Sequence, residues 1–161
     1  MIILGIDPGL ARIGYGVIAK TGSSQKLVAS GLITTPANKS LPDRLVLINR
    51  ALRQVLKKHQ PDLVSIEKLF FFKNAKTAFS VGQAWGVITF TVSEFKLPIL
   101  ELTPLQIKQT VTGYGHAEKV QVYKILKMIL KTKSLPKQDD TVDAIACAFC
   151  ACQNISNKYR L

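Results

Sequence analysis

The sequence predicts an α/β domain built on a mixed five-stranded sheet flanked by helices. Three observations support this fold class: short apolar runs rich in β-branched residues, longer segments with apolar residues at helical spacing, and the order in which the two alternate. Three strands come first, and helices then alternate with two further strands, which indicates a sheet with a parallel portion. The 161 residues fit a single domain, 1–161, around one core.

The first three strands are expected at residues 1–7, 13–19 and 26–34, and a Gly-Ser-Ser turn between the last two indicates an antiparallel meander. The two further strands are expected at residues 63–67 and 98–102. Pro8 and Gly9 end the first strand directly after Asp7, and the fourth strand ends at Glu67. Two strands that read as buried therefore each finish at a carboxylate.

Helices are expected at residues 41–58, 74–95, 104–111, 118–131 and 140–153. The first of them is preceded by a Ser40-x-x-Asp43 capping pattern. In the second, Gly82 and Gly86 lower the helix propensity and indicate close packing against a neighbour. Residues 132–138, which contain Lys, Ser and Pro, are expected to form the most mobile loop.

The chain is strongly basic, with 22 Lys and Arg against 10 Asp and Glu, a net charge of +12 and a pI near 9.8. Such a charge repels itself unless a polyanion is the working partner, so nucleic acid is the expected ligand. Between residues 104 and 137 seven lysines stand against one acid, Glu118, which favours a binding face. The seven are Lys108, Lys119, Lys124, Lys127, Lys131, Lys133 and Lys137.

Neither a membrane segment nor a secretion signal is expected. The apolar start of the chain is too short for a signal peptide, and no stretch reaches the roughly 18 uninterrupted apolar residues of a membrane helix, so we expect a cytoplasmic protein. Cys147, Cys150 and Cys152 have a C-x-x-C spacing that zinc sites use. However, no second pair is present and both histidines are distant, so small packing residues on a helix are the favoured interpretation.

The acids at the strand ends and near the last helix form a candidate metal site. An ionised acid in an apolar setting is costly unless it is paired or metal-bound, which applies to Asp7 and Glu67. Asp140 and Asp143 lie one helical turn apart on one face, and Asp139 could serve equally by geometry. Carboxylate oxygens suit Mg²⁺, and two such ions can drive phosphodiester hydrolysis.

A simpler interpretation exists for each acid alone. Asp139, Asp140 and Asp143 could complement the dipole of a helix start, and Asp7 before Pro8 could be a turn residue. Taken together with the basic face, the acids favour a metal site that acts on nucleic acid.

Four blocks of sequence, in order across nearly the whole chain, resemble one family. The blocks are GIDPGLARIGYGVI at 5–18, SIEKLFFFKNAKTAFSVGQAWGV at 65–87, QIKQTVTGYGHAEKVQV at 106–122 and DDTVDAIACA at 139–148. They resemble the RuvC-type crossover-junction endonucleases. The resemblance implies a ribonuclease H-like fold and a homodimer that nicks two like-polarity strands of a four-way (Holliday) junction symmetrically, in DNA recombination and repair. It further implies 5′-phosphate and 3′-hydroxyl ends.

The resemblance also implies cofactor, partners and site residues. The expected cofactor is Mg²⁺, one or two ions per subunit, with Mn²⁺ as a possible substitute, and the expected partners are RuvA and RuvB. The residues that match the family's catalytic, metal-binding acids are Asp7, Glu67, Asp140 and Asp143, which leaves Asp139 as a bystander. The residues that match its DNA-contacting positions are Lys108, Lys119 and Phe70, the last as an aromatic side chain at the junction.

Two positions depart from the family pattern. Ile13 stands where threonine is frequent, which should change only local packing, and Trp85 stands where arginine is usual, which removes a phosphate contact and could substitute stacking. Three other functions remain open: a YqgF-type nuclease that acts on RNA, a DNA-binding module without catalysis, and a sugar-kinase-like ATPase. The small size of the chain argues against the third.

Overall fold

A computed structural model describes residues 1–69 and 75–158 of the chain, and the side chains within 1–69 and 78–154. In these residues the strands are β1 (Ile2–Asp7), β2 (Arg12–Thr21), β3 (Ser24–Thr34), β4 (Leu63–Glu67) and β5 (Ile99–Leu102). The helices are α1 (Leu41–His59), α2 (Ala75–Glu94), α3 (Pro104–Thr112), α4 (Lys119–Ile129) and α5 (Asp139–Lys158). Every predicted strand and helix is present.

The five strands form one mixed sheet in the order β3-β2-β1-β4-β5. The pairs β1–β2 and β2–β3 are antiparallel, while β1–β4 and β4–β5 are parallel, as the sequence predicted. In the parallel pair Ile6 lies opposite Ile66, so the next residue of each strand, Asp7 and Glu67, ends at the same edge of the sheet. Brought together by register alone, these two acids mark that edge as the candidate site.

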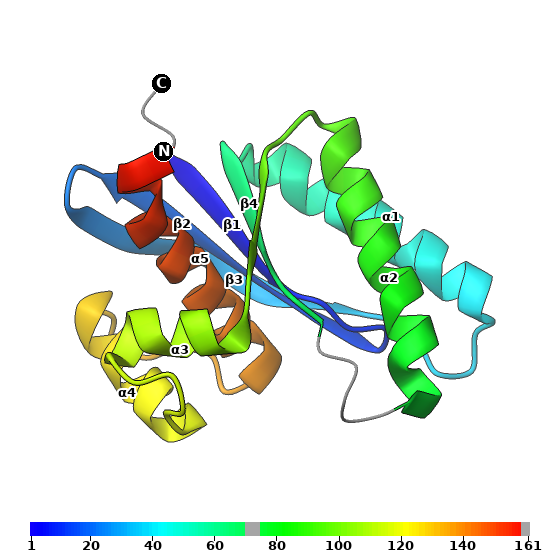
Figure 1. Ribbon diagram of the computed structural model, residues 1–161. Helices are drawn as coiled ribbons and strands as arrows, with labels where there is room; N and C mark the ends of the chain where they lie inside the picture. Colours follow the sequence, from blue (N-terminus) through cyan, green and yellow to red (C-terminus); the bar gives the residue numbers. More distant parts are fainter. Residues whose placement is uncertain (70–74, 159–161) are drawn as a thin grey trace.

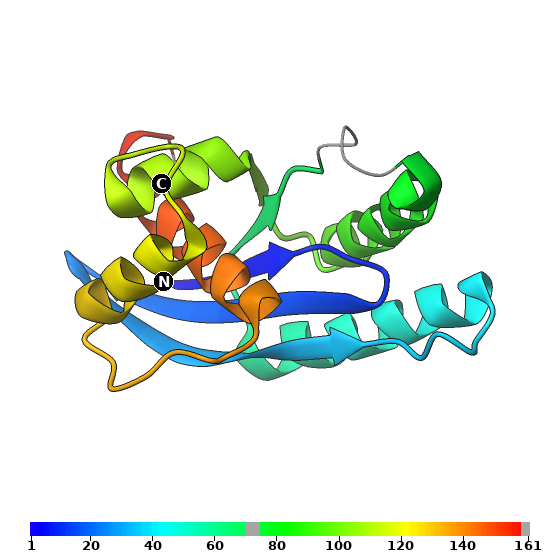
Figure 2. The same ribbon diagram turned by 90° about the horizontal axis from the view of Figure 1, so that it is seen from below.

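Helices cover both faces of the sheet (Figures 1 and 2). Helices α1 and α2 pack together on one face, above a core that contains Leu4, Ile48 and Ile88. Helix α5 lies on the other face with α3 and α4 around it, and Leu126 and Ile145 belong to that second core. The three cysteines of α5 are buried there, which confirms that they are packing residues.

Helix α5 approaches the sheet unusually closely because glycines face it. A Cβ atom on Gly14 would lie 1.8 Å from the carbonyl oxygen of Asp140, and one on Gly5 would lie 2.1 Å from that of Ala144. Any other residue at these two positions would push the helix away. Since Gly14 pairs with Asp7 in the sheet, the close contact holds the start of α5 beside the end of β1.

The ends of several helices follow local signals in the sequence. The Ser40 hydroxyl accepts a hydrogen bond from the Asp43 backbone N–H at 3.3 Å, which confirms the predicted cap of α1. Helix α4 ends at Ile129, two residues before the predicted end, because Lys131 adopts a left-handed conformation with φ of 48°. No described helix has the length and apolar character that a membrane span requires.

Candidate active site

Residues from four elements meet beside the end of β4. Glu67 from β4, Lys108 from α3, Lys119 from α4 and Asp143 from α5 line one pocket of about 130 Å³. The parallel sheet fixes Glu67, and the packing of α5 fixes Asp143 on its second turn. Four elements of the chain thus supply two acids and two cations to a single small cavity.

Burial and mutual repulsion perturb the acids of this site. Burial, together with the charges of Glu67, Asp143 and Asp140, raises the pKa of Asp7 from 3.8 to about 8, against a smaller opposing effect of Lys119. Burial, followed by the charge of Asp143, raises the pKa of Glu67 from 4.5 to about 7. Four carboxyl groups therefore share a site that is short of positive charge.

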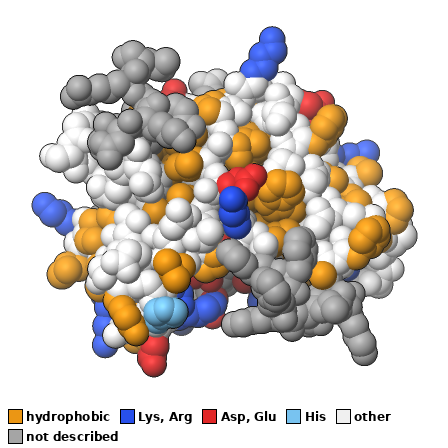
Figure 3. All heavy atoms as spheres, in the orientation of Figure 1, with side chains coloured by type: hydrophobic (Ala, Val, Ile, Leu, Met, Phe, Trp, Pro, Cys, Tyr) orange, Lys and Arg blue, Asp and Glu red, His pale blue; other side chains and the backbone are white. Residues whose placement is uncertain are grey.

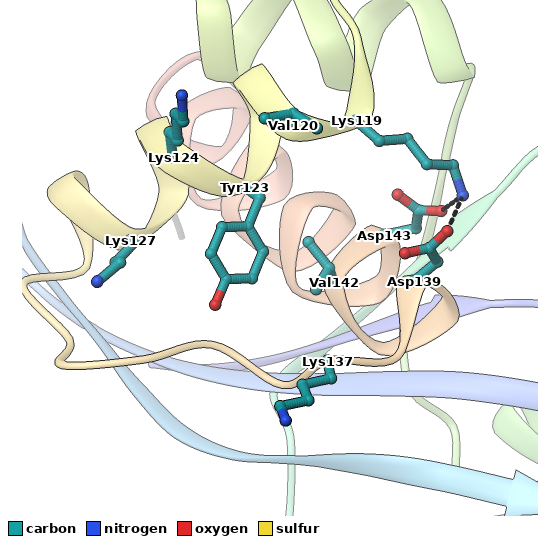
Figure 4. Close-up of a pocket in the computed structure, with 9 residues that line it drawn as sticks. All are labelled: Lys119, Val120, Tyr123, Lys124, Lys127, Lys137, Asp139, Val142 and Asp143. Carbon is teal, nitrogen blue, oxygen red and sulfur yellow. Dashed lines mark hydrogen bonds and ion pairs between the residues drawn. The ribbon is translucent and has the colours of Figure 1, made fainter.

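Two basic side chains partly compensate the acids of α5. Lys119 Nζ lies 3.2 Å from Asp143 Oδ2 and 3.2 Å from Asp139 Oδ2, as Figure 4 shows. Burial lowers the pKa of Lys119, but these two carboxylates outweigh it and raise the value overall. On the other side Arg12 Nε lies 2.8 Å from Asp140 Oδ2. Each end of the acid group is thus held by a cation.

The donor set fits a hard divalent cation. Carboxylate oxygens are the ligands that Mg²⁺ and Mn²⁺ take. Burial and the repulsion between carboxylates raise the pKa values of Asp7 and Glu67, and a bound cation would offset both effects by stabilising the ionised forms. Among the described residues no three acid, histidine or cysteine side chains stand close enough to hold a metal ion as they are placed. The ion pairs of Asp140 with Arg12 and of Asp143 with Lys119 keep these carboxylates engaged elsewhere.

Asp139 differs from its two neighbours on α5. Its side chain is 68% exposed, whereas those of Asp140 and Asp143 are 25% and 31% exposed. The acids whose charges raise the pKa of Asp7 are Glu67, Asp143 and Asp140. The geometry thus separates Asp139 from the other acids, and its role as a bystander stays a prediction.

Basic side chains form part of the surface near the acids. The space-filling view shows several Lys and Arg side chains at the lower left, where α3 and α4 lie in Figure 1 (Figure 3). Lys108 and Lys119 belong to this surface and line the pocket with Glu67. His116 lies in the loop between α3 and α4, where its ring contacts that of Tyr114 at 5.8 Å between centroids.

Three further residues have different outcomes. Phe70, expected at the junction, lies outside the described residues. Ile13 is 1% exposed in the core beneath α1 and α2, so its effect is on packing, as expected. Trp85 is half-buried against that same core, and its buried Nε1 has no hydrogen-bond partner in the described chain, so its stacking on DNA stays a prediction.

Sequence reasoning missed Arg12. Its ion pair with Asp140 joins residues 128 positions apart in the chain, and no pattern in the sequence links them. Only its place in the chain hints at this role. Arg12 begins β2 directly after the Asp7-Pro8-Gly9 turn, so its side chain lies near the element that packs on the end of β1.

Comparison with known proteins places this arrangement in a family. A family model described as crossover junction endodeoxyribonuclease RuvC matches residues 3–151. The crossover junction endodeoxyribonuclease RuvC of Petrotoga mobilis is 50% identical over 150 residues, which cover 93% of this chain and 92% of that protein. The protein of the same name from Halothermothrix orenii is 46% identical over 161 residues, which cover 100% of this chain and 95% of that protein.

Solved structures agree with these matches. The RuvC structure of Thermus thermophilus superposes with a TM-score of 0.87 at 30% identity and covers 97% of this chain and 96% of its own. The same protein in complex with a Holliday junction substrate also gives 0.87, at 31% identity, with 93% and 92% covered. The yeast mitochondrial resolvase Ydc2, at 16% identity and a TM-score of 0.70, shares the fold. This chain belongs to the RuvC family of crossover junction endodeoxyribonucleases.

Proposed function

We propose that this chain resolves Holliday junctions at a divalent-metal site formed by Asp7, Glu67, Asp140 and Asp143. Membership of the family makes it a nuclease that acts on DNA junctions and depends on divalent metal. One observation carries the assignment of the site: Asp7 is half-buried, and its pKa is raised to about 8 by that burial and by the other three acids. Such a group is unfavourable in a fold unless a cation uses it.

The roles of the residues follow from their charges and positions. The four acids hold Mg²⁺, with Mn²⁺ as a substitute, and a divalent ion so held would activate water and stabilise the leaving oxygen of a phosphodiester. Lys108 and Lys119, which line the pocket with Glu67, neutralise the scissile phosphate and position it over the acids. Hydrolysis that releases the 3′ oxygen leaves 5′-phosphate and 3′-hydroxyl ends.

The ion pairs made by three acids at the start of α5 define a competition. Arg12 is bound to Asp140, and Lys119 is bound to Asp143 and Asp139, so a divalent ion takes these carboxylates only when the two cations release them. Both cations are largely exposed, at 63% for Arg12 and 60% for Lys119, so neither pair is strong. Once released, both side chains are free to contact phosphate.

Helix α2 supports the expected homodimer. Phe79 and Phe90 are 76% and 63% exposed, and their spacing of 11 residues puts them on one face of the helix. Gly86 lies between them with no atom within 4 Å of an added Cβ, which leaves room for a second backbone. Exposed aromatic side chains beside a small residue are typical of a protein interface, and a two-fold dimer offers two equivalent sites to a four-way junction.

The remaining partners follow from the family. The relative from Thermus thermophilus was solved with a Holliday junction substrate, and four-way DNA is the substrate we propose here. Cleavage of two like-polarity strands requires one active site from each subunit. The branch-migration proteins RuvA and RuvB are the proposed protein partners, and the cytoplasm is the proposed place of action.

Nicking of a synthetic four-way junction tests the proposal. The junction, a linear duplex of the same sequence and a structured RNA are each incubated with the wild-type chain in Mg²⁺, Mn²⁺ or EDTA. Paired, metal-dependent nicks confined to the junction are expected, and Asp7→Asn should remove cleavage while binding persists. Asp43→Asn, at the capped start of α1, is the matched control and should cleave normally.

Other outcomes point to other functions. Junction binding without cleavage in any divalent metal would identify a DNA-binding module that does not act as a nuclease. Cleavage of the RNA without preference for the junction would favour a YqgF-type activity. Unpaired nicks, with the DNA specificity retained, would contradict the dimer and leave the metal site intact.

A further inference from the structure

A basic hollow opens beside the acids, between helix α4 and the segment 131–138. Its volume is about 430 Å³, and its walls come from α4, from that segment and from the start of α5. Lys119 and Asp143 line both this hollow and the smaller pocket over Glu67, so the two cavities share a wall. A strand that leaves the acids in this direction enters the hollow directly.

The hollow carries positive charge that no described carboxylate neutralises. Lys124 and Lys127 stand three residues apart on α4, and Lys137 belongs to the segment that forms the opposite wall (Figure 4). All three are exposed, and none makes an ion pair with a described carboxylate, whereas Lys119 is paired with Asp139 and Asp143. Three cations thus lack a counter-ion in the described part of the chain.

Tyr123 holds the two lysine-bearing walls together. Its hydroxyl donates to the Leu135 carbonyl oxygen at 3.2 Å and accepts from the Leu135 N–H at 3.4 Å, so the ring bridges α4 and the segment before α5. Leu135 itself is 4% exposed in the core. The backbone separation between Lys137 and the lysines of α4 is therefore set before any ligand arrives, which lowers the entropic cost of binding.

We propose that this hollow is a second DNA subsite, which binds the phosphates of the strand that flanks the scissile phosphate. This inference rests on the proposed function. The ligand chemistry follows from the lining: unpaired ammonium groups suit phosphate oxygens, and the apolar side chains Val120 and Val142 suit the sugar faces between them. Contacts of this kind bind without sequence preference and fix the register of the strand over the acids.

The salt dependence of junction binding tests the subsite. Binding is measured in the Asp7→Asn background, which keeps the DNA intact, and Lys124, Lys127 and Lys137 are together changed to Gln. Each lost phosphate contact reduces the slope of log Kd against log salt by about 0.9, so we expect the slope to fall by about 2–3 and affinity to drop about tenfold or more. Phosphate-ethylation interference should disappear at positions beside the cleavage site.

A matched variant separates the subsite from net charge. Lys26, Lys57 and Lys96 are also exposed, and changing them to Gln lowers the net charge equally. All three lie at the end of the sheet away from Asp7. Lys26 pairs with Ala19, which pairs with Ile2 at the start of β1. Lys57 and Lys96 lie near the C-terminal ends of α1 and α2, the helices that lead into β4 and β5. This control should leave both the slope and the interference pattern nearly unchanged.

The outcomes distinguish the subsite from the function on which it rests. Equal loss of slope in the two triple variants, or an unchanged slope in the Lys124, Lys127 and Lys137 variant, would overturn the subsite while the wild-type chain still cleaves junctions. Failure of the proposed function would instead appear as an absence of junction cleavage by the wild-type chain. Because all six lysines are exposed, both triple variants should fold, and unchanged thermal unfolding checks this.

Discussion

Helices α2 and α5 are each 20 residues long and lie on opposite faces of the sheet, yet they bury themselves differently. Helix α5 presents buried small residues such as Ala144, Cys147 and Ala148 to strands that carry glycine, so its backbone is fixed against the sheet. Helix α2 buries Ala84 and Ile88 but leaves Phe79 exposed. The fixed helix positions acids, and the helix with an open face carries the surface at which we propose that a second chain binds.

The most damaging change should be one that lifts α5 from the sheet. Gly14→Ala places a Cβ 1.8 Å from the Asp140 carbonyl oxygen, and the helix must move to accept it. We expect a loss of about 3 kcal/mol or more in the free energy of unfolding, together with loss of junction cleavage. Urea unfolding and nicking assays measure the two effects.

Gly86→Ala on α2 is the matched control for that substitution. Nothing in the described chain lies within 4 Å of its added Cβ, so the free energy of unfolding of the monomer, measured at concentrations below the dimer dissociation constant, should stay the same or rise by up to about 1 kcal/mol. Equal destabilisation by the two substitutions would show that close packing does not distinguish α5 from α2.

The open face of α2 should respond to charge. Phe79→Glu combined with Phe90→Glu puts two carboxylates on the proposed interface, and we expect the dimer dissociation constant to rise about a hundredfold or more. Sedimentation equilibrium measures this constant. Met128→Glu on α4, where the side chain is 70% exposed, is the control and should leave the mass of the wild-type assembly unchanged. A wild-type chain that sediments as a monomer would remove the α2 interface.

The half-buried acid at the end of β1 should cost stability at high pH. Asp7 loses its proton near pH 3.8 when unfolded and near pH 8 when folded, so the unfolding free energy without metal falls as pH rises between these values. Asp7→Asn removes this cost, and it should raise the free energy of unfolding by about 1–3 kcal/mol at pH 8 in EDTA, with little change near pH 4.

The same protonation should govern metal binding. A divalent ion must displace the protons of Asp7 and Glu67, so the Mg²⁺ concentration for half-maximal cleavage should fall as pH rises toward about 8. Thermal unfolding with and without Mg²⁺ at pH 6 and pH 8 gives an independent measurement. A stabilisation by Mg²⁺ that does not grow with pH would contradict the assignment of these two acids.

The smallest effect is expected at Arg12. Its pair with Asp140 competes with metal, but the arginine side chain is 63% exposed and the pair is worth less than about 1 kcal/mol. Arg12→Gln should therefore strengthen Mn²⁺ binding about two- to fivefold, as measured by titration with EPR detection of free Mn²⁺. Arg53→Gln, which breaks the exposed pair with Glu94 on the other face, should leave Mn²⁺ binding unchanged.

The sequence predicted those features that local patterns encode. The apolar runs that end at Asp7 and Glu67 placed both acids at one sheet edge, and the helical spacing of Asp140 and Asp143 placed them one turn apart, as the structure has them. The family resemblance then separated Asp139 from the other acids, and its greater exposure agrees with that choice.

Other features depend on contacts between distant segments, and the sequence did not reveal them. The pair between Arg12 and Asp140 forms only because α5 docks beside β2, and the inward placement of Trp85 depends on the rotation of α2 about its axis. Gly14 and Gly16 lie on the same face of β2 and allow α5 to pack close to the sheet. The sequence shows these glycines, but it does not show which helix covers them.

Two neighbouring acids on α5 test whether Asp7, Glu67, Asp140 and Asp143 act as one metal site. Asp143 and Asp139 both belong to the start of α5, and Oδ2 of each lies 3.2 Å from Lys119 Nζ. Only Asp143 lines the pocket with Glu67. In Mg²⁺, Asp143→Asn should reduce nicking of a four-way junction at least about a thousandfold, while Asp139→Asn should stay within about threefold of wild type. Equal activity of the two variants, or a greater loss in Asp139→Asn, would contradict the account.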